Sequence, residues 1–147
     1  MLMNFTEEQI QDFTVRIEKL DLALKPKFGN MNVNQMVCHC TDFFRLAMGT
    51  KKALEYGVVD PKEVIALARS KKTVTAPKGF GQVEGEGTLP TNLENDKELL
   101  KEQMIQFSRL DKDFTYPEHP FFGEIGRERW VELAYYHLNH HLKQFRV

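Results

Sequence analysis

The stretch RERWVELAYYHLNHHLKQF, residues 127–145, contains neither proline nor glycine and carries a helical pattern over its whole length. Because an α-helix advances about 100° per residue, six of its side chains fall on one stripe: Trp130, Leu133, Ala134, His137, His141 and Gln144. The opposite side carries polar or charged side chains: Glu128, Glu132, Asn139 and Lys143. A helix of this kind buries its apolar side against neighbouring elements.

Three further long helices are predicted upstream, at about residues 6–21, 33–48 and 95–110. The first two begin with capping boxes, in which Thr6 is followed by Gln9 and Asn32 is followed by Gln35. Gly49 is placed to end the second helix, because glycine readily adopts the left-handed backbone of a helix terminus. Together the four patterns predict an all-α fold.

The connection between the second and third long helices is much longer than a turn. It spans residues 50–93 and includes a short helix in DPKEVIALARS, residues 60–70, with Asp60 as N-cap and Pro61 at the first helical position. A connection of this length predicts a crossover that leaves the second and third long helices parallel. The expected architecture is a single four-helix-bundle domain, residues 1–147, with up-down-down-up topology.

Three of the five histidines are predicted to face the interior. His137 and His141 lie four residues apart on the apolar stripe, whereas His140 lies on its flank. In the second helix, His39 belongs to an inward seam that also contains three apolar residues: Met36, Phe43 and Leu46. His39, His137 and His141 can therefore aim ring nitrogens at one point.

Two interpretations of these three histidines remain open from the residues alone. Burying a polar group without a partner costs about 2–7 kcal/mol, so each ring needs either a hydrogen bond or a shared metal ion. The first interpretation is structural or acid–base histidines, and the second is a three-histidine metal site. A metal site of neutral imidazoles would weaken as the pH falls through the usual histidine range near about 6.5.

Other residues near the histidines have smaller expected roles. Cys38 and Cys40 are rotated to either side of His39, so neither a disulfide between them nor metal ligation is expected. The candidate proton carriers are His119, His140 and Asp42. Asp42 follows His39 by three residues and is placed to orient its ring.

Composition restricts the partners. The chain has 20 basic and 21 acidic residues, and its only basic cluster, residues 69–72, is short and has no interleaved aromatics. This argues against nucleic acid or a membrane surface as the main partner. No long apolar run and no signal-peptide pattern occur, so a cytoplasmic location is expected.

Two segments resemble the DinB-like superfamily of four-helix-bundle metalloproteins: VNQMVCHCTDFFRLAMG, residues 33–49, and HPFFGEIGRERWVELAYYHLNHHLKQF, residues 119–145. The His-Pro-Phe-Phe-Gly opening of the second segment resembles an uncharacterised branch of that superfamily. The resemblance implies the up-down-down-up bundle and a divalent metal ion. It also implies that His39, His137 and His141 are its ligands.

The function implied by the resemblance is a metal-dependent enzyme, a transferase or hydrolase that acts on a small molecule. Zinc or nickel is expected first, and manganese or iron is also compatible with imidazole ligands. A low-molecular-weight thiol is a candidate cosubstrate, and a homodimer is a candidate assembly. The alternative is a non-catalytic metal- or ligand-binding bundle with a stress or regulatory role.

Overall fold

The computed structural model of this chain describes residues 4–70 and 74–147. Lys71 and Lys72 of the basic cluster lie outside the described residues. The described residues form five helices and contain no strand. His119 and Gly123 form an isolated bridge through two backbone hydrogen bonds. The prediction of an all-α chain is confirmed.

Helices α1 (Glu7–Glu18) and α2 (Val33–Met48) begin as their sequences predict. The side chain of Thr6 accepts a hydrogen bond from the backbone N–H of Gln9, and the Gln9 side chain reaches back to the Thr6 backbone. The equivalent reciprocal pair is present at the start of α2. Gly49 ends α2 with φ +78°, a left-handed conformation that favours glycine.

The remaining helices are α3 (Pro61–Arg69), α4 (Leu93–Ser108) and α5 (Gly126–Gln144). The side chain of Asp60 caps α3, as predicted. Helix α4 begins at Leu93, two residues before the predicted start, because Asn92 is its N-cap and its side chain accepts a hydrogen bond from the backbone N–H of Asn95.

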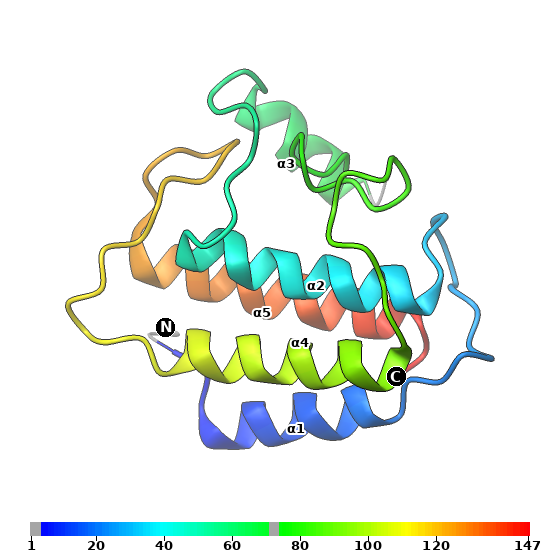
Figure 1. Cartoon of the computed structure of the whole chain (residues 1–147). Helices are drawn as coiled ribbons and strands as arrows, with labels where there is room; N and C mark the ends of the chain where they lie inside the picture. Colours follow the sequence, from blue (N-terminus) through cyan, green and yellow to red (C-terminus); the bar gives the residue numbers. More distant parts are fainter. Residues whose placement is uncertain (1–3, 71–73) are drawn as a thin grey trace.

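The four long helices lie side by side (Figure 1). Helix α2 contacts α4 and α5, and α1 contacts the same two helices. In Figure 1 the chain runs from right to left along α2 and α4 and from left to right along α1 and α5. The hydrophobic core between them contains five fully buried aromatic side chains: Phe13, Phe44, Phe107, Trp130 and Phe145.

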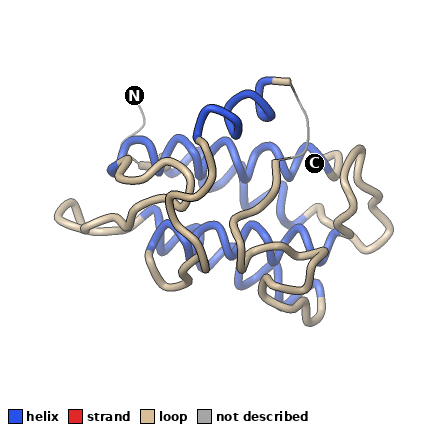
Figure 2. Tube along the Cα trace, turned by 90° about the horizontal axis from the view of Figure 1, so that it is seen from above, coloured by secondary structure: helices blue, strands red, loops and turns tan. Residues whose placement is uncertain are grey.

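The long connection between α2 and α4 lies over one side of the long helices (Figure 2). Helix α3 contacts none of the other helices in the described part of the chain. It borders an open cleft of about 430 Å³, whose apolar lining includes Val58, Leu67 and Phe121. Within the described ranges, no helix combines the length and the apolar character needed to cross a bilayer.

Two buried carboxylates fasten the end of this connection to the long helices. Asp42 on α2 accepts hydrogen bonds from the backbone N–H and the hydroxyl of Thr88, at 2.8 and 2.6 Å. Asp96 on α4 accepts the same two hydrogen bonds from Thr91, at 2.9 and 2.6 Å. The segment TLPT, residues 88–91, is therefore tied to both helices.

Candidate metal centre

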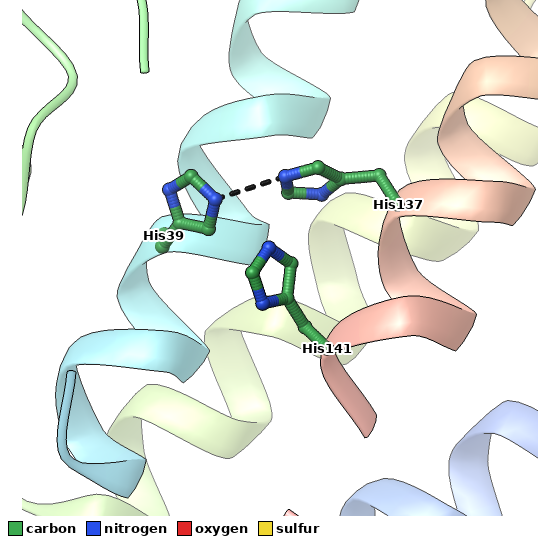
Figure 3. A group of neighbouring side chains, drawn as sticks. All are labelled: His39, His137 and His141. Carbon is green, nitrogen blue, oxygen red and sulfur yellow. Dashed lines mark hydrogen bonds between the residues drawn. The ribbon is translucent and has the colours of Figure 1, made fainter. Parts of the chain in front are cut away.

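The three inward histidines come together between α2 and α5. The rings of His39, His137 and His141 form a nearly equilateral triangle, with centroid separations of 4.7, 4.7 and 4.6 Å. One nitrogen of each ring faces the others, and these nitrogens lie within 4.8 Å of one another (Figure 3). The group could hold a metal ion.

Only one hydrogen bond is present among the three nitrogens that face the centre of the triangle. Nε2 of His39 and Nε2 of His137 lie 2.9 Å apart, so one of them donates a hydrogen bond to the other. His141 uses Nδ1 for a contact with Gln144, so the nitrogen that points at the other two rings is Nε2. Nδ1 of His137 is buried and has no hydrogen-bond partner among the described residues.

Burial keeps these imidazoles neutral. Desolvation lowers the pKa of His39 to about 4 and the pKa of His141 to about 3. It also lowers the pKa of His137 well below its ordinary value, with a further contribution from His141. The lowered pKa values move the expected weakening of metal binding to a more acidic range than pH 6.5, because a desolvated ring resists protonation.

The environment of the cluster is aromatic, and no carboxylate from the described part of the chain joins the histidine group. Phe43 stacks on the ring of His137, with centroids 4.4 Å apart and an interplanar angle of 18°. The group with metal-ligand geometry contains only imidazoles. A set of neutral nitrogen donors would leave the charge of a bound cation uncompensated by its protein ligands.

A metal ion fits this donor set. Imidazole nitrogens bind zinc at about 2.0–2.1 Å, which places two ligands of a tetrahedral ion about 3.4 Å apart. The facing nitrogens of His39 and His137 lie 2.9 Å apart, and all three facing nitrogens lie within 4.8 Å of one another, close to the spacing that such an ion requires. One cation would also accept all three lone pairs at once, whereas the cluster itself contains a single hydrogen bond.

His140 lies outside the triangle, as its position on the flank of the stripe predicts. Its ring stacks on Tyr136, with centroids 5.7 Å apart, and lies 5.2 Å from the ring of Phe28. It is only half-buried, and desolvation lowers its pKa. The two adjacent histidines of α5 therefore have different surroundings.

His119 shapes the turn before α5. Its Nδ1 accepts hydrogen bonds from the backbone N–H groups of Phe121 and Phe122, at 3.0 and 3.3 Å. The ring is buried against Trp130, and desolvation lowers its pKa to about 4. A histidine in this state is neutral near pH 7 and holds its proton on Nε2.

Asp42 does not orient His39 through a hydrogen bond in the described residues. Its carboxylate instead faces Thr88 and the Arg45 guanidinium, which lies 3.4 Å away. Asp42 lies one helical turn from His39, but the residue that donates hydrogen bonds to its carboxylate is Thr88, 46 positions away in the chain.

The cysteines form no disulfide, as predicted, and both are buried. Burial raises the pKa of the Cys38 thiol to about 12, and it raises the pKa of Cys40 as well. Neither belongs to the group that could hold a metal. A protonated thiol is a poor nucleophile and a poor metal ligand.

Gln144 is the neighbour of the cluster for which the sequence suggested no role. Its Oε1 lies 2.7 Å from Nδ1 of His141, and its Nε2 donates to the carbonyl oxygen of Phe28 at 2.8 Å. The helical stripe identified Gln144 as inward-facing. The contact with Phe28 joins residues 116 positions apart and has no local signal.

Comparison with known proteins places the chain in a family. No curated protein and no solved structure is significantly similar to it. One family profile matches residues 2–147, which is nearly the entire sequence. The chain belongs to that family, described as "protein of unknown function (DUF1569)", which is part of the DinB-like superfamily.

Proposed function

We propose that this protein is a metal-dependent enzyme whose divalent ion is held by His39, His137 and His141. The observation that carries the proposal is the triangle of three neutral imidazoles, which directs one nitrogen of each ring at a common point with a single hydrogen bond among them. Structural histidines are normally satisfied by protein partners. These rings instead face one another.

The expected chemistry follows from an incomplete ligand set. A closed structural zinc site has four protein ligands, whereas three ligands leave positions for water or substrate. An ion at this site would supply Lewis acidity at those positions. The chain's own residues would hold the ligands in place and exclude bulk water, with the stacked ring of Phe43 covering His137.

The reaction class proposed is transfer or hydrolysis of a small molecule, with a low-molecular-weight thiol as cosubstrate. This rests on membership of the DinB-like superfamily rather than on a substrate contact. Zinc and nickel are the preferred ions, with manganese and iron as the other candidates. The buried thiols of Cys38 and Cys40 are unsuited to serve as the nucleophile, so a thiol would have to come from solution.

The architecture proposed for this function is an up-down-down-up four-helix bundle in one domain, residues 1–147. The helix directions in Figure 1 and a single hydrophobic core that draws on all four long helices support this topology. The proposed site lies between α2 and α5, the second and last long helices. We also propose that the protein acts in the cytoplasm as a homodimer.

Metal titration tests the proposal directly. Metal-free protein is titrated separately with Zn²⁺, Ni²⁺, Mn²⁺ and Fe²⁺, and binding is followed by calorimetry. We expect one ion per chain, with X-ray absorption showing three imidazole nitrogens in its coordination shell. Turnover of thiol-transfer and hydrolysis substrates is then compared with and without the ion. Absence of stoichiometric binding for every ion would exclude the metal centre, and binding without turnover would favour the non-catalytic alternative.

A further inference from the structure

We propose that Gln144 is a positioning residue for His141. Its carboxamide, held by the carbonyl group of Phe28, keeps the His141 proton on Nδ1 and leaves the Nε2 lone pair directed at His39 and His137. This inference rests on the proposed metal site for its functional meaning. The placement of the proton, however, is a property of the metal-free protein and is tested separately.

The direction of both hydrogen bonds is fixed by the carbonyl group of Phe28, which cannot donate. The backbone carbonyl oxygen of Phe28 can only accept, so the amide atom facing it at 2.8 Å must be the NH₂ group of Gln144. The carbonyl oxygen of the carboxamide then faces Nδ1 of His141 at 2.7 Å. An oxygen acceptor requires a donor, so Nδ1 carries the proton and Nε2 is bare.

This contact is built into a closely packed place. Gln144 is the last residue of α5, and its side chain is buried. Its own backbone carbonyl accepts the N–H of Lys27 at 2.8 Å, which holds the same segment of chain against the helix end. Gly29 has φ +80°, and a Cβ atom there would lie 2.9 Å from Nε2 of Gln144. A glycine therefore lets this segment approach the carboxamide.

A simpler role must be distinguished from positioning. Gln144 would also fasten residues 27–29 to α5 if His141 had no special task. The chain offers a matched control in Gln82, a second buried glutamine whose Nε2 donates to a backbone carbonyl, that of Thr88, at 2.8 Å. Gln82 fastens a loop but has no hydrogen bond to a histidine among the described residues.

The first measurement locates the proton. Long-range ¹H–¹⁵N correlation spectra of the ¹⁵N-histidine-labelled, metal-free protein at pH 7 distinguish the protonated nitrogen of each ring. We expect His141 to be protonated on Nδ1 in the wild-type protein and in Gln82→Leu. Gln144→Leu should convert this single state into a mixture of tautomers.

The second measurement is Zn²⁺ affinity, determined by competition with a chromophoric chelator. Loss of a residue that orients a metal ligand typically lowers metal affinity by about 10–100-fold, and we expect that range for Gln144→Leu. Gln82→Leu should bind Zn²⁺ like the wild-type protein. Circular dichroism of each metal-free variant checks that the helices are intact.

The outcomes separate this inference from the proposed function. A wild-type His141 protonated on Nε2 overturns the inference, whatever the metal does. Unchanged Zn²⁺ affinity in folded Gln144→Leu also overturns it but leaves the metal centre standing. If the wild-type protein binds no metal, the proposed function fails, and the spectra alone decide whether Gln144 fixes the tautomer.

Discussion

The two sides of α2 both bury polar groups, but they treat them differently. On the side facing α4 and the long connection, the carboxylate of Asp42 accepts three hydrogen bonds, two from Thr88 and a longer one from Arg45. On the side facing α5, His39 meets two other imidazoles, and the only hydrogen bond among the three facing nitrogens joins His39 to His137. One side is satisfied by the protein, and the other is not.

This difference separates structural polar groups from groups that await a ligand. A buried polar atom normally has a protein or water partner, and leaving it without one costs free energy. Asp42 and Asp96 meet that requirement through the paired donors of Thr88 and Thr91. On the histidine side, the facing nitrogens share one hydrogen bond, and Nδ1 of His137 has no partner among the described residues. The same helix therefore carries both a structural anchor and a candidate metal centre.

The largest expected effect comes from removing one member of the histidine side. His141→Ala should lower Zn²⁺ affinity by more than the roughly 100-fold upper range for residues that merely orient ligands. His39→Ala and His137→Ala should do the same. His140→Ala is the matched control, because it removes the same chemistry from the adjacent position, and its Zn²⁺ content after purification should equal that of wild type. Equal losses in the two neighbouring variants would contradict the separation of the two rings.

His119, whose Nδ1 accepts two backbone hydrogen bonds, should make the stability of the protein depend on pH. Its folded-state pKa of about 4 lies below its ordinary value, so the unfolded chain takes up the proton more readily. Its contribution to stability is therefore complete above about pH 6.5 and is lost as the pH falls towards 4. His119→Asn keeps an acceptor but cannot titrate. Urea unfolding of the metal-free proteins should show a shallower decline for this variant, by about 3 kcal/mol in total. Parallel pH profiles would exclude this role for His119.

Weakening the carboxylate side should lower stability without changing metal binding. Thr88→Val preserves the shape of the side chain but removes the hydroxyl that donates to Asp42 at 2.6 Å. Loss of a hydrogen bond to a charged group should reduce the free energy of unfolding by about 2 kcal/mol, measured in urea. Zn²⁺ affinity of the folded variant should stay at the wild-type value. A parallel loss of affinity would show that the two sides are coupled.

The smallest expected effect concerns the thiols. Cys38→Ala and Cys40→Ala should retain one Zn²⁺ per chain, because both sulfur atoms lie outside the histidine group. In the wild-type protein, reaction with a thiol-specific chromogenic reagent should be slow until denaturant is added, since burial raises the pKa of both thiols. Metal loss in either cysteine variant would assign that cysteine to the centre.

Local signals were sufficient to predict most of the fold. The capping boxes at Thr6 and Asn32 placed the starts of α1 and α2, because cap and partner are only three residues apart. Helical spacing likewise placed His137 and His141 on one face and His140 off it. The start of α4 was predicted too late because Asn92 was not recognised as the N-cap.

Long-range contacts explain what the sequence did not reveal. Asp42 was expected to face His39, one turn away, yet its carboxylate bonds to Thr88 across 46 positions. The contact of Gln144 with Phe28 spans 116 positions. The lowered pKa of the three ligand candidates also depends on burial produced by the whole fold. Spacing within one helix carries no information about any of these.

The isolation of α3 has a consequence for how the molecule opens. Val64 is the only buried residue of α3, and α3 packs against no other helix among the described residues. Its amide hydrogens should exchange with solvent through local unfolding, while those of α2 should require opening of the whole core. Because the chain is fastened again at Thr88 and Thr91, such unfolding stops short of α4. The α3 region is accordingly the place where this fold can accept inserted sequence or a protease cut while the histidine triangle stays assembled.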